Sequence, residues 1–334
     1  MVDNQLSDDL HLLYKCFARR EANLTCIVEE MNRYIKENGK AIITDEENVK
    51  DAIKFTQSLL DFKARMDRQI QFCFNSNIKF EKGRDLSFME FMNQSQQPPY
   101  HMAAYLNNFL IKDCQGKTAQ ECDELLSSVI RLFCCLQERD TFVKNCEHYL
   151  HLRLLNKTML NKETEEQLIK KIQQEVGFNS GAKMVSMFKD IDLSKDIVVE
   201  FNKTKESKQC EIELASVQVL SQGTWPIDMA DALKLAYPLR LKKLHENFED
   251  YYKRSKRNRT LHMLNQYGSC ELKAGFNTKL IITTTVVQAC ILDCYNSSDN
   301  LTYGDLKKQL NIDEGILQGH LKPLVFGKGA IITK

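Results

Sequence analysis

Apolar residues recur at helical spacing over most of the first two hundred positions. One helical face is formed by apolar residues three and four positions apart: Leu24, Ile27, Val28, Met31 and Ile35. No proline lies between Tyr100 and Trp225, which favours packed helices, because a proline in a helix interior costs about 3 kcal/mol. The polar residues 93–99 end in two prolines and predict a loop and a domain boundary.

A second group of helices is predicted from residue 118 onward. Thr118 and Glu121 have the form of a capping box at the start of the first of them. Further helices are predicted over 142–155, over 163–176 and around 184–191, and Ser194 is expected to cap the next one. Short loops between such helices favour a helical bundle.

The apolar period then changes from helical to alternating. Ile212 and Leu214 alternate with glutamates, and after a one-residue slip at 215–216 Val217 and Val219 continue the alternation. A slip in a period of two indicates a β-bulge or a change of sheet. This pattern predicts a strand over 212–220.

Two more strands are predicted nearer the C-terminus. Cys270, Leu272, Ala274 and Phe276 alternate with polar residues or glycine, and residues 280–284 follow after a turn. Between the strand over 212–220 and these strands, residues 238–253 predict a helix. So few strands make an incomplete sheet, and an added strand from a partner could complete it.

Trp225 is the only tryptophan of the chain, and it follows Gly223 at the end of the first predicted strand. Two interpretations stay open. The indole can fill the core beneath the sheet, or it can anchor the turn that ends a docking strand. The two can hold together.

The last segment has the pattern of a winged helix. Thr302 caps a helix that runs to residue 310, a turn at 311–313 follows, and a second helix covers 316–324. A Gly-Lys-Gly turn at 327–329 then leads to a predicted strand over 330–332.

Composition narrows the functional classes. The chain has 334 residues, 43% hydrophobic and 27% charged, with a net charge of +1, which excludes a disordered tail and a strongly basic nucleic-acid binder. The N-terminus lacks the pattern of a signal peptide, and the apolar run 280–292 is too short and polar to span a bilayer. We therefore expect an intracellular soluble protein with no membrane contact.

No motif of catalysis or of metal binding is present. The twelve cysteines include no C-x-x-C pair, and His148 and His151 have no second ligand pair at zinc-site spacing. Phosphate-loop, dinucleotide, nucleophile-elbow and zinc-protease motifs are all missing. The sequence therefore predicts buried reduced thiols, no catalytic residue, no metal, no cofactor and no small-molecule substrate.

The strongest charge feature lies between Arg240 and Arg259, where eight residues are basic and three are acidic. It is either a solvated loop after a helix or a docking surface for an acidic partner or nucleic acid. The second helix of the winged-helix pattern carries Asp313 and Glu314 and is slightly acidic, which disfavours reading a DNA groove. Nucleic-acid binding through residues 253–259 stays as the alternative function.

Three phrases of the sequence, taken together, resemble a known family. They are LHLRLL at 150–155, KMVSMFKDIDLSKDI at 183–197 and VLSQGTWPIDM at 219–229, followed by the basic segment before Leu261. In this order and spacing they resemble the cullin homology region. Leu261, His262 and Met263 stand where the family commonly has Leu-Thr-Trp, which suggests a divergent member.

The resemblance implies a mainly α fold in four parts. Residues 1–110 would form the last helical cullin repeat, 111–205 a four-helix bundle, 206–288 a small α+β sheet domain and 289–334 a winged-helix domain. It also implies a partial chain. The adaptor-binding repeats that precede this region and the C-terminal winged helix with the modification lysine are not in this sequence.

Cullins are scaffolds of RING-type ubiquitin ligases, so the resemblance implies a non-catalytic scaffold in the cytoplasm and nucleus. In the family, a RING-box protein adds its N-terminal strand to the α/β sheet, and its RING recruits a ubiquitin-conjugating enzyme. The residues expected to bind the RING-box protein are Ile212, Leu214, Val217, Val219, Leu220, Trp225, Leu272, Ala274 and Phe276.

In some members a basic surface beside the RING receives the acidic tail of the conjugating enzyme. The residues expected to form it here are Arg153, Lys253, Arg254, Lys256, Arg257 and Arg259. Leu152 stands where the family usually has a further basic residue, which would weaken this surface.

Overall fold

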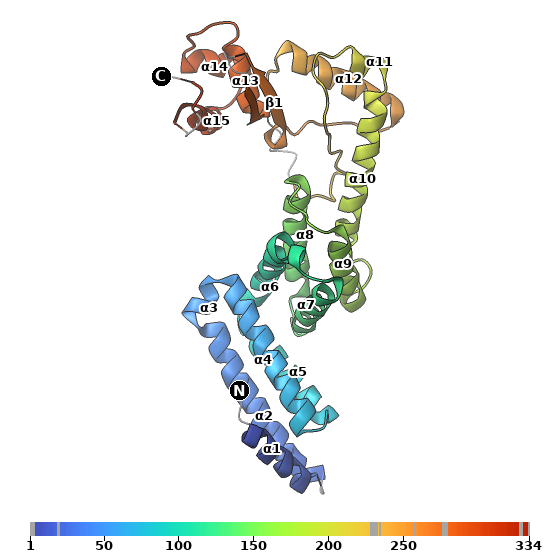
Figure 1. The fold of residues 1–334 in the computed structure, drawn as a ribbon, viewed down its shortest axis with the longest axis vertical. Coiled ribbons are helices and arrows are strands. Elements are labelled where there is room, and N and C mark those ends of the chain that lie inside the picture. Colours follow the sequence, from blue (N-terminus) through green and yellow to red (C-terminus); the bar gives the residue numbers. More distant parts are fainter. Residues whose placement is uncertain are drawn as a thin grey trace. The chain divides into compact units, whose positions relative to one another are not determined.

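Helices dominate the chain, and a small sheet lies near its C-terminal end (Figure 1). The computed structural model describes residues 4–18, 21–227, 233, 235–256, 258–275, 280–326 and 330–332. The α-helices up to residue 202 are α1 Asn4–Phe17, α2 Glu21–Thr44, α3 Glu46–Lys50, α4 Ala52–Cys73, α5 Ile78–Met92, α6 Gln97–Asn108, α7 Ala119–Phe133, α8 Arg139–Leu155, α9 Lys162–Val176 and α10 Ala182–Asn202. The remaining elements are η1 Phe109–Asp113, η2 Cys114–Gly116, α11 Lys205–Lys208, α12 Leu239–Ser255, η4 Asn265–Tyr267, β1 Ser269–Ala274, β2 Leu280–Thr285, α13 Val286–Cys294, α14 Tyr303–Leu310 and α15 Glu314–Phe326.

The chain divides into two units. Residues 1–191 together with 220–226 form the first, and residues 192–219 together with 227–334 form the second. The division falls inside α10, so this helix contributes side chains to both. The domain boundaries predicted from the sequence stay predictions.

The first unit begins with helices that pack lengthwise. Helix α2 packs against α4 and α5, and these three run side by side in Figure 1. Leu24 and Ile35 of the predicted apolar face of α2 are buried, so that face is confirmed. The core of this part is rich in aromatic side chains, all of them buried: Phe55, Phe62, Phe80, Phe88 and Phe91.

The loop predicted over 93–99 is shorter than expected. Helix α6 begins at Gln97, and Pro98 and Pro99 occupy its first turn. Proline is tolerated there because the first amides of a helix have no intrahelical acceptor to lose.

Helices α7 to α10 correspond to the predicted bundle. The capping box of Thr118 and Glu121 is present at the start of α7, and α9 ends at Gly177, whose φ is +102°. The predicted helix start at Ser194 is wrong, because α10 continues without a break from Ala182 to Asn202. Ser194 is only 1% exposed in the interior of this helix, and its hydroxyl binds the backbone of Val219 instead of capping.

A buried ion pair ties three helices of the first unit together. Arg153 of α8 donates to both carboxylate oxygens of Glu165 on α9, at 2.6 and 2.7 Å, and to Asn107 Oδ1 of α6 at 2.7 Å. Both charged side chains are almost fully buried, at 4% and 3% exposure. Two parallel bonds to a carboxylate and a third to an amide oxygen pair the guanidinium, which a buried charge requires.

The second unit contains the small sheet. Strands β1 and β2 pair antiparallel from Ser269 opposite Thr285 to Ala274 opposite Leu280, which confirms both predicted strands in this region. Strand β2 runs directly into α13, and Thr285 caps that helix through the backbone N–H of Gln288 at 3.2 Å.

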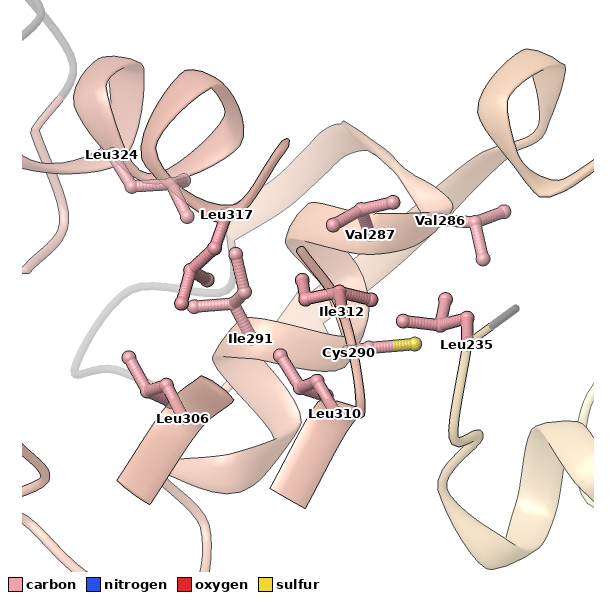
Figure 2. Close-up of a cluster of buried hydrophobic side chains, with 10 residues drawn as sticks. All are labelled: Leu235, Val286, Val287, Cys290, Ile291, Leu306, Leu310, Ile312, Leu317 and Leu324. Carbon is pink, nitrogen blue, oxygen red and sulfur yellow. The ribbon is translucent and has the colours of Figure 1, made fainter. Parts of the chain in front are cut away.

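The helices after the sheet pack around one apolar core. Figure 2 shows buried side chains from α13, α14 and α15 directed toward one another, together with Ile312 and Leu235. Cys270 of β1 packs against the same cluster, so the sheet and these helices share it. The predicted helix, turn and helix are confirmed, with Asn311 in the left-handed conformation at φ +51° ending α14.

The strand predicted over 330–332 is wrong. The amides of Ile331 and Ile332 both donate to the carbonyl of Leu324, at 2.9 and 3.1 Å. The segment therefore folds back onto the last turn of α15 instead of joining a β-ladder. The wing turn predicted at 327–329 lies outside the described residues.

Within the described part of the chain, no helix combines the length and the apolarity that crossing a bilayer requires.

The ion pair of Arg153 and Glu165 gives a test of the bundle. We expect Arg153→Met to lower the free energy of unfolding of the first unit by about 3–5 kcal/mol, because Glu165 would be left buried without a partner. Replacing both residues, as Arg153→Met with Glu165→Leu, should cost less than Arg153→Met alone. Urea denaturation followed by circular dichroism measures both.

A matched control uses an exposed pair. Arg33 and Glu30 are 2.6 Å apart on α2 and about two-thirds exposed, so Arg33→Met should cost less than about 1 kcal/mol. Equal losses for Arg33→Met and Arg153→Met would contradict the assignment of a structural role to the buried pair.

Candidate functional site

Residues 212–219 belong to the second unit and Leu220 to the first. Half-buried and exposed residues alternate from 212 to 215, and residues 217–220 are all half-buried. Ile212 and Leu214 are half-buried between exposed glutamates, Ala215 and Ser216 are both exposed, and Val217 and Val219 are half-buried. The phase slip predicted at 215–216 is therefore confirmed. The predicted strand is not, because no residue of segment 212–220 is assigned to a strand.

Segment 212–220 packs on two helices. Its inward side chains contact a cluster formed by Ile197 and Phe201 of α10 and by Leu244, Phe248 and Tyr252 of α12. Within that cluster Phe201 and Phe248 meet edge to face, with ring centroids 5.2 Å apart. The segment thus has the side-chain alternation of a strand and packs on two helices. It forms no β-ladder in the described chain, because a ladder requires a second strand beside it.

Side chains of α10 bind the backbone of this segment. The Val219 amide donates to Ser194 Oγ at 2.8 Å, and the Ser194 hydroxyl lies 3.4 Å from the Val219 carbonyl. The Asn202 amide group donates to the Leu214 carbonyl at 3.2 Å. Two polar side chains of one helix therefore hold the segment at two points.

The turn that follows is fixed by Asp190, also on α10. Its Oδ2 accepts from the Ser221 amide and from Trp225 Nε1, both at 2.8 Å, and its Oδ1 accepts from the Ser221 hydroxyl at 2.9 Å. Gly223 has φ +79°, a conformation that glycine adopts without strain. One carboxylate thus binds both ends of the turn 221–225.

Trp225 is 5% exposed and belongs to the first unit, together with Asp190. The interpretation that it fills the core beneath the sheet stays a prediction. The interpretation that it anchors the turn ending the segment agrees with its bond to Asp190. With so little of its surface exposed, Trp225 would support a docking site from within.

The two-stranded sheet supplies the other predicted docking residues. Leu272 and Ala274 of β1 are half-buried on one face, opposite Ile282 and Leu280 of β2. Each strand of this sheet has a single neighbouring strand in the described chain, so each keeps a second edge without a strand partner. Phe276, predicted for the same site, lies outside the described residues.

The predicted basic surface is only partly present. Arg153 cannot belong to an exposed surface, because its guanidinium is buried against Glu165, and that part of the prediction is wrong. Lys253 and Arg254 are exposed but paired with Glu249 and Glu206, at 2.7 and 2.8 Å.

Lys256 and Arg259 are exposed, and Arg257 lies outside the described residues.

Among the described residues, no three histidine, cysteine or acidic side chains lie close enough together to hold a metal ion. Burial raises the pKa of the Cys146 and Cys290 thiols to about 12, which keeps them protonated and poorly nucleophilic near neutral pH. Burial and a bond to Glu175 raise the pKa of Cys134 to about 12 as well.

Sequence reasoning did not identify Asp190, Ser194 and Asn202 as residues that hold the site. A signal for two of them was present, since Asp190 and Ser194 are two of the four polar positions of the phrase M-F-K-D-I-D-L-S. Their partners Val219, Ser221 and Trp225 lie in the phrase V-L-S-Q-G-T-W-P. Two of the three phrases that carry the resemblance are therefore joined by hydrogen bonds.

Comparisons with known proteins cover the whole chain. The family model described as the cullin alpha solenoid domain matches residues 1–198, and the one described as the cullin alpha+beta domain matches residues 219–334. The chain is 29% identical to Cullin-3B and 30% identical to Cullin-3A of Arabidopsis thaliana, over 100% of the chain and 46% of each relative. It is 28% identical to Cullin-3 of Dictyostelium discoideum, over 100% of the chain and 43% of the relative. The chain therefore spans less than half the length of these relatives.

Trp225 should contribute strongly to stability. We expect Trp225→Ala to lower the free energy of unfolding by about 3–5 kcal/mol, the usual cost of truncating a buried aromatic side chain. Trp225→Phe also loses the bond to Asp190, but it should cost less, since it keeps most of the buried aromatic surface. A melting temperature of Trp225→Ala within error of the parent chain would show that the indole does not contribute to stability.

Asp190 can be tested through the same indole. Because Trp225 is the only tryptophan, its fluorescence reports on the turn 221–225 without labelling. Asp190→Ala removes three acceptor contacts and should shift the emission maximum to longer wavelength as water reaches the ring. Asp196→Ala, an exposed carboxylate on the same helix, is the control and should leave the spectrum unchanged. Identical spectra for both variants would contradict the anchoring role of Asp190.

Proposed function

Because the chain belongs to the cullin family, we propose that it is a non-catalytic scaffold that binds a RING-box protein by strand addition. In this function the RING of the bound protein recruits a ubiquitin-conjugating enzyme, which carries out the chemistry. The scaffold contributes a rigid platform and no catalytic residue. We keep the expectation that it acts in the cytoplasm and nucleus.

The observation that supports this function best is the state of segment 212–220. It has the side-chain alternation of a strand and packs on α10 and α12, yet it belongs to no strand in the described chain. Peptide recognition by strand addition uses such a backbone, because main-chain hydrogen bonds give affinity and alternate side chains give specificity. Strands β1 and β2 offer further edges in the same unit, and a two-stranded sheet gains stability from added strands.

The docking residues divide into two roles under this proposal. Ile212, Leu214, Val217 and Val219 anchor the segment by their inward side chains. Leu220 is half-buried at the end of the segment, where the turn held by Asp190 begins. Leu272 and Ala274 hold β1 in position through their half-buried side chains. The edge of β1 would then recognise the incoming strand mainly through backbone groups.

A second part of the proposal concerns the basic residues. Lys253, Arg254, Lys256 and Arg259 are the exposed cations available to an acidic tail of the conjugating enzyme. Two of them already have acidic partners in the chain, so Lys256 and Arg259 would carry most of the attraction. The same pairing weakens the alternative of nucleic-acid binding, which requires unpaired cations against phosphates.

Co-expression with a RING-box protein tests the central claim. We expect a stable complex on size-exclusion chromatography, because the partner strand would form a β-ladder with segment 212–220, which belongs to no strand in the described chain. A RING-box protein without its N-terminal strand is the control and should not co-elute. Hydrogen exchange should show new protection of amides within 212–220 and β1 in the complex.

Two results would count against this function. The first is a chain that circular dichroism shows to be folded and that elutes without the RING-box protein. The second is a complex in which exchange within 212–220 and β1 is unchanged, since the partner would then be bound elsewhere.

A further inference from the structure

Side chains of α10 form hydrogen bonds with the backbone of segment 212–220, as the backbone of a neighbouring strand would in a sheet. Ser194 binds both backbone groups of Val219, and Asn202, eight residues further along the helix, binds the carbonyl of Leu214. Eight residues correspond to about 12 Å of helix and to a net rotation of about 80°, so both side chains project from the same half of the helix. As α10 advances from 194 to 202, the contacted segment runs back from 219 to 214, so the two are antiparallel.

These bonds help to hold the segment extended although no strand lies beside it in the described chain. An extended segment with no neighbouring strand has no ladder to hold it, and its residues would regain backbone freedom. The inward side chains fix the segment on the platform, but apolar contacts are not directional. Hydrogen bonds from Ser194 and Asn202 fix the rotation of the backbone about its own axis, and with it the edge that faces α10.

We infer that Ser194 and Asn202 are positioning residues that hold segment 212–220 extended, with one backbone edge toward α10, before a partner strand arrives. The inference rests on the proposed function and adds to it the direction from which the partner strand approaches. The incoming strand must approach the edge of the segment that faces away from α10. Because the segment is ordered in advance, less entropy is lost when the partner binds.

The surroundings of the two residues support a role beyond packing. Ser194 is 1% exposed in the interior of α10. Here its hydroxyl serves the backbone of a residue 25 positions away. Asn202 is half-buried, and its carbonyl oxygen lies 3.4 Å from the Ser207 hydroxyl, which orients the amide group toward Leu214.

The test compares variants that remove the hydrogen bond with variants that keep it. Ser194→Ala removes the hydroxyl, and Ser194→Thr retains it. Asn202→Asp keeps the size of the side chain but replaces the donor with an acceptor that faces the Leu214 carbonyl. Asp196→Ala, an exposed residue of the same helix, is the matched control.

Two readouts are needed for each variant. The first is hydrogen exchange of the free chain, in which the amides of α12 report the stability of the whole unit and the Val219 amide reports the segment. The second is the dissociation constant of the complex with a RING-box protein, measured by titration calorimetry.

We expect Ser194→Ala and Asn202→Asp to speed exchange within 212–220 while the α12 amides keep their protection. The dissociation constant should rise about fivefold to tenfold, the usual consequence of losing one intramolecular hydrogen bond. Ser194→Thr and Asp196→Ala should bind within about twofold of the parent chain.

Three outcomes overturn parts of the account separately. Unchanged affinity and exchange in Ser194→Ala and Asn202→Asp would overturn the inference while leaving the proposed function intact. Loss of α12 protection at unchanged affinity would also overturn it, since the residues would then serve only stability. Failure of the parent chain to bind overturns the proposed function, and exchange at Val219 alone then decides whether α10 holds the segment.

Discussion

A group of hydrogen bonds from one face of α10 fixes the part of the chain on which the proposed function depends. Asp190 and Ser194 reach backbone and indole groups that lie 25 to 35 residues further along the sequence. They set where segment 212–220 ends and which way its backbone faces. The apolar platform of α10 and α12 holds the inward side chains, but it cannot by itself choose the orientation of the main chain.

The division of the chain into two units gives these bonds a further consequence. Asp190 and the turn 221–225 belong to the first unit, whereas Ser194 and residues 192–219 belong to the second. Each set of contacts is complete within its own unit. The chain therefore passes between the units at three points, within α10 between residues 191 and 192, at 219–220 and at 226–227. The candidate docking segment ends at the second of these points.

Much of the fold follows from periodicity in the sequence. The apolar stripe of α2, the capping box of α7, the strands β1 and β2 and the slip at Ala215–Ser216 are local patterns, and each is found where the pattern places it. Two of the errors concern partners distant in the sequence. Ser194 has the form of a helix cap until its bond to Val219 is seen, and Arg153 resembles a surface cation until Glu165 is placed beside it.

The candidate site shows the same limit. Alternation correctly identifies the inward residues of segment 212–220, because burial on a platform imposes the same period of two as burial in a sheet. It cannot tell whether a neighbouring strand is present, since ladder partners are set by the tertiary fold. The residues that hold the segment were also beyond local reasoning, because a polar residue inside a helix is usually solvated or bonded to its own helix.

The most direct test of the account is a structure of this chain bound to a RING-box protein. The account predicts that the partner's N-terminal strand pairs with the edge of segment 212–220 that faces away from α10, with the bonds of Ser194 to Val219 and of Asn202 to Leu214 retained. A partner strand placed between the segment and α10, or one that leaves residues 212–220 unpaired, would contradict it.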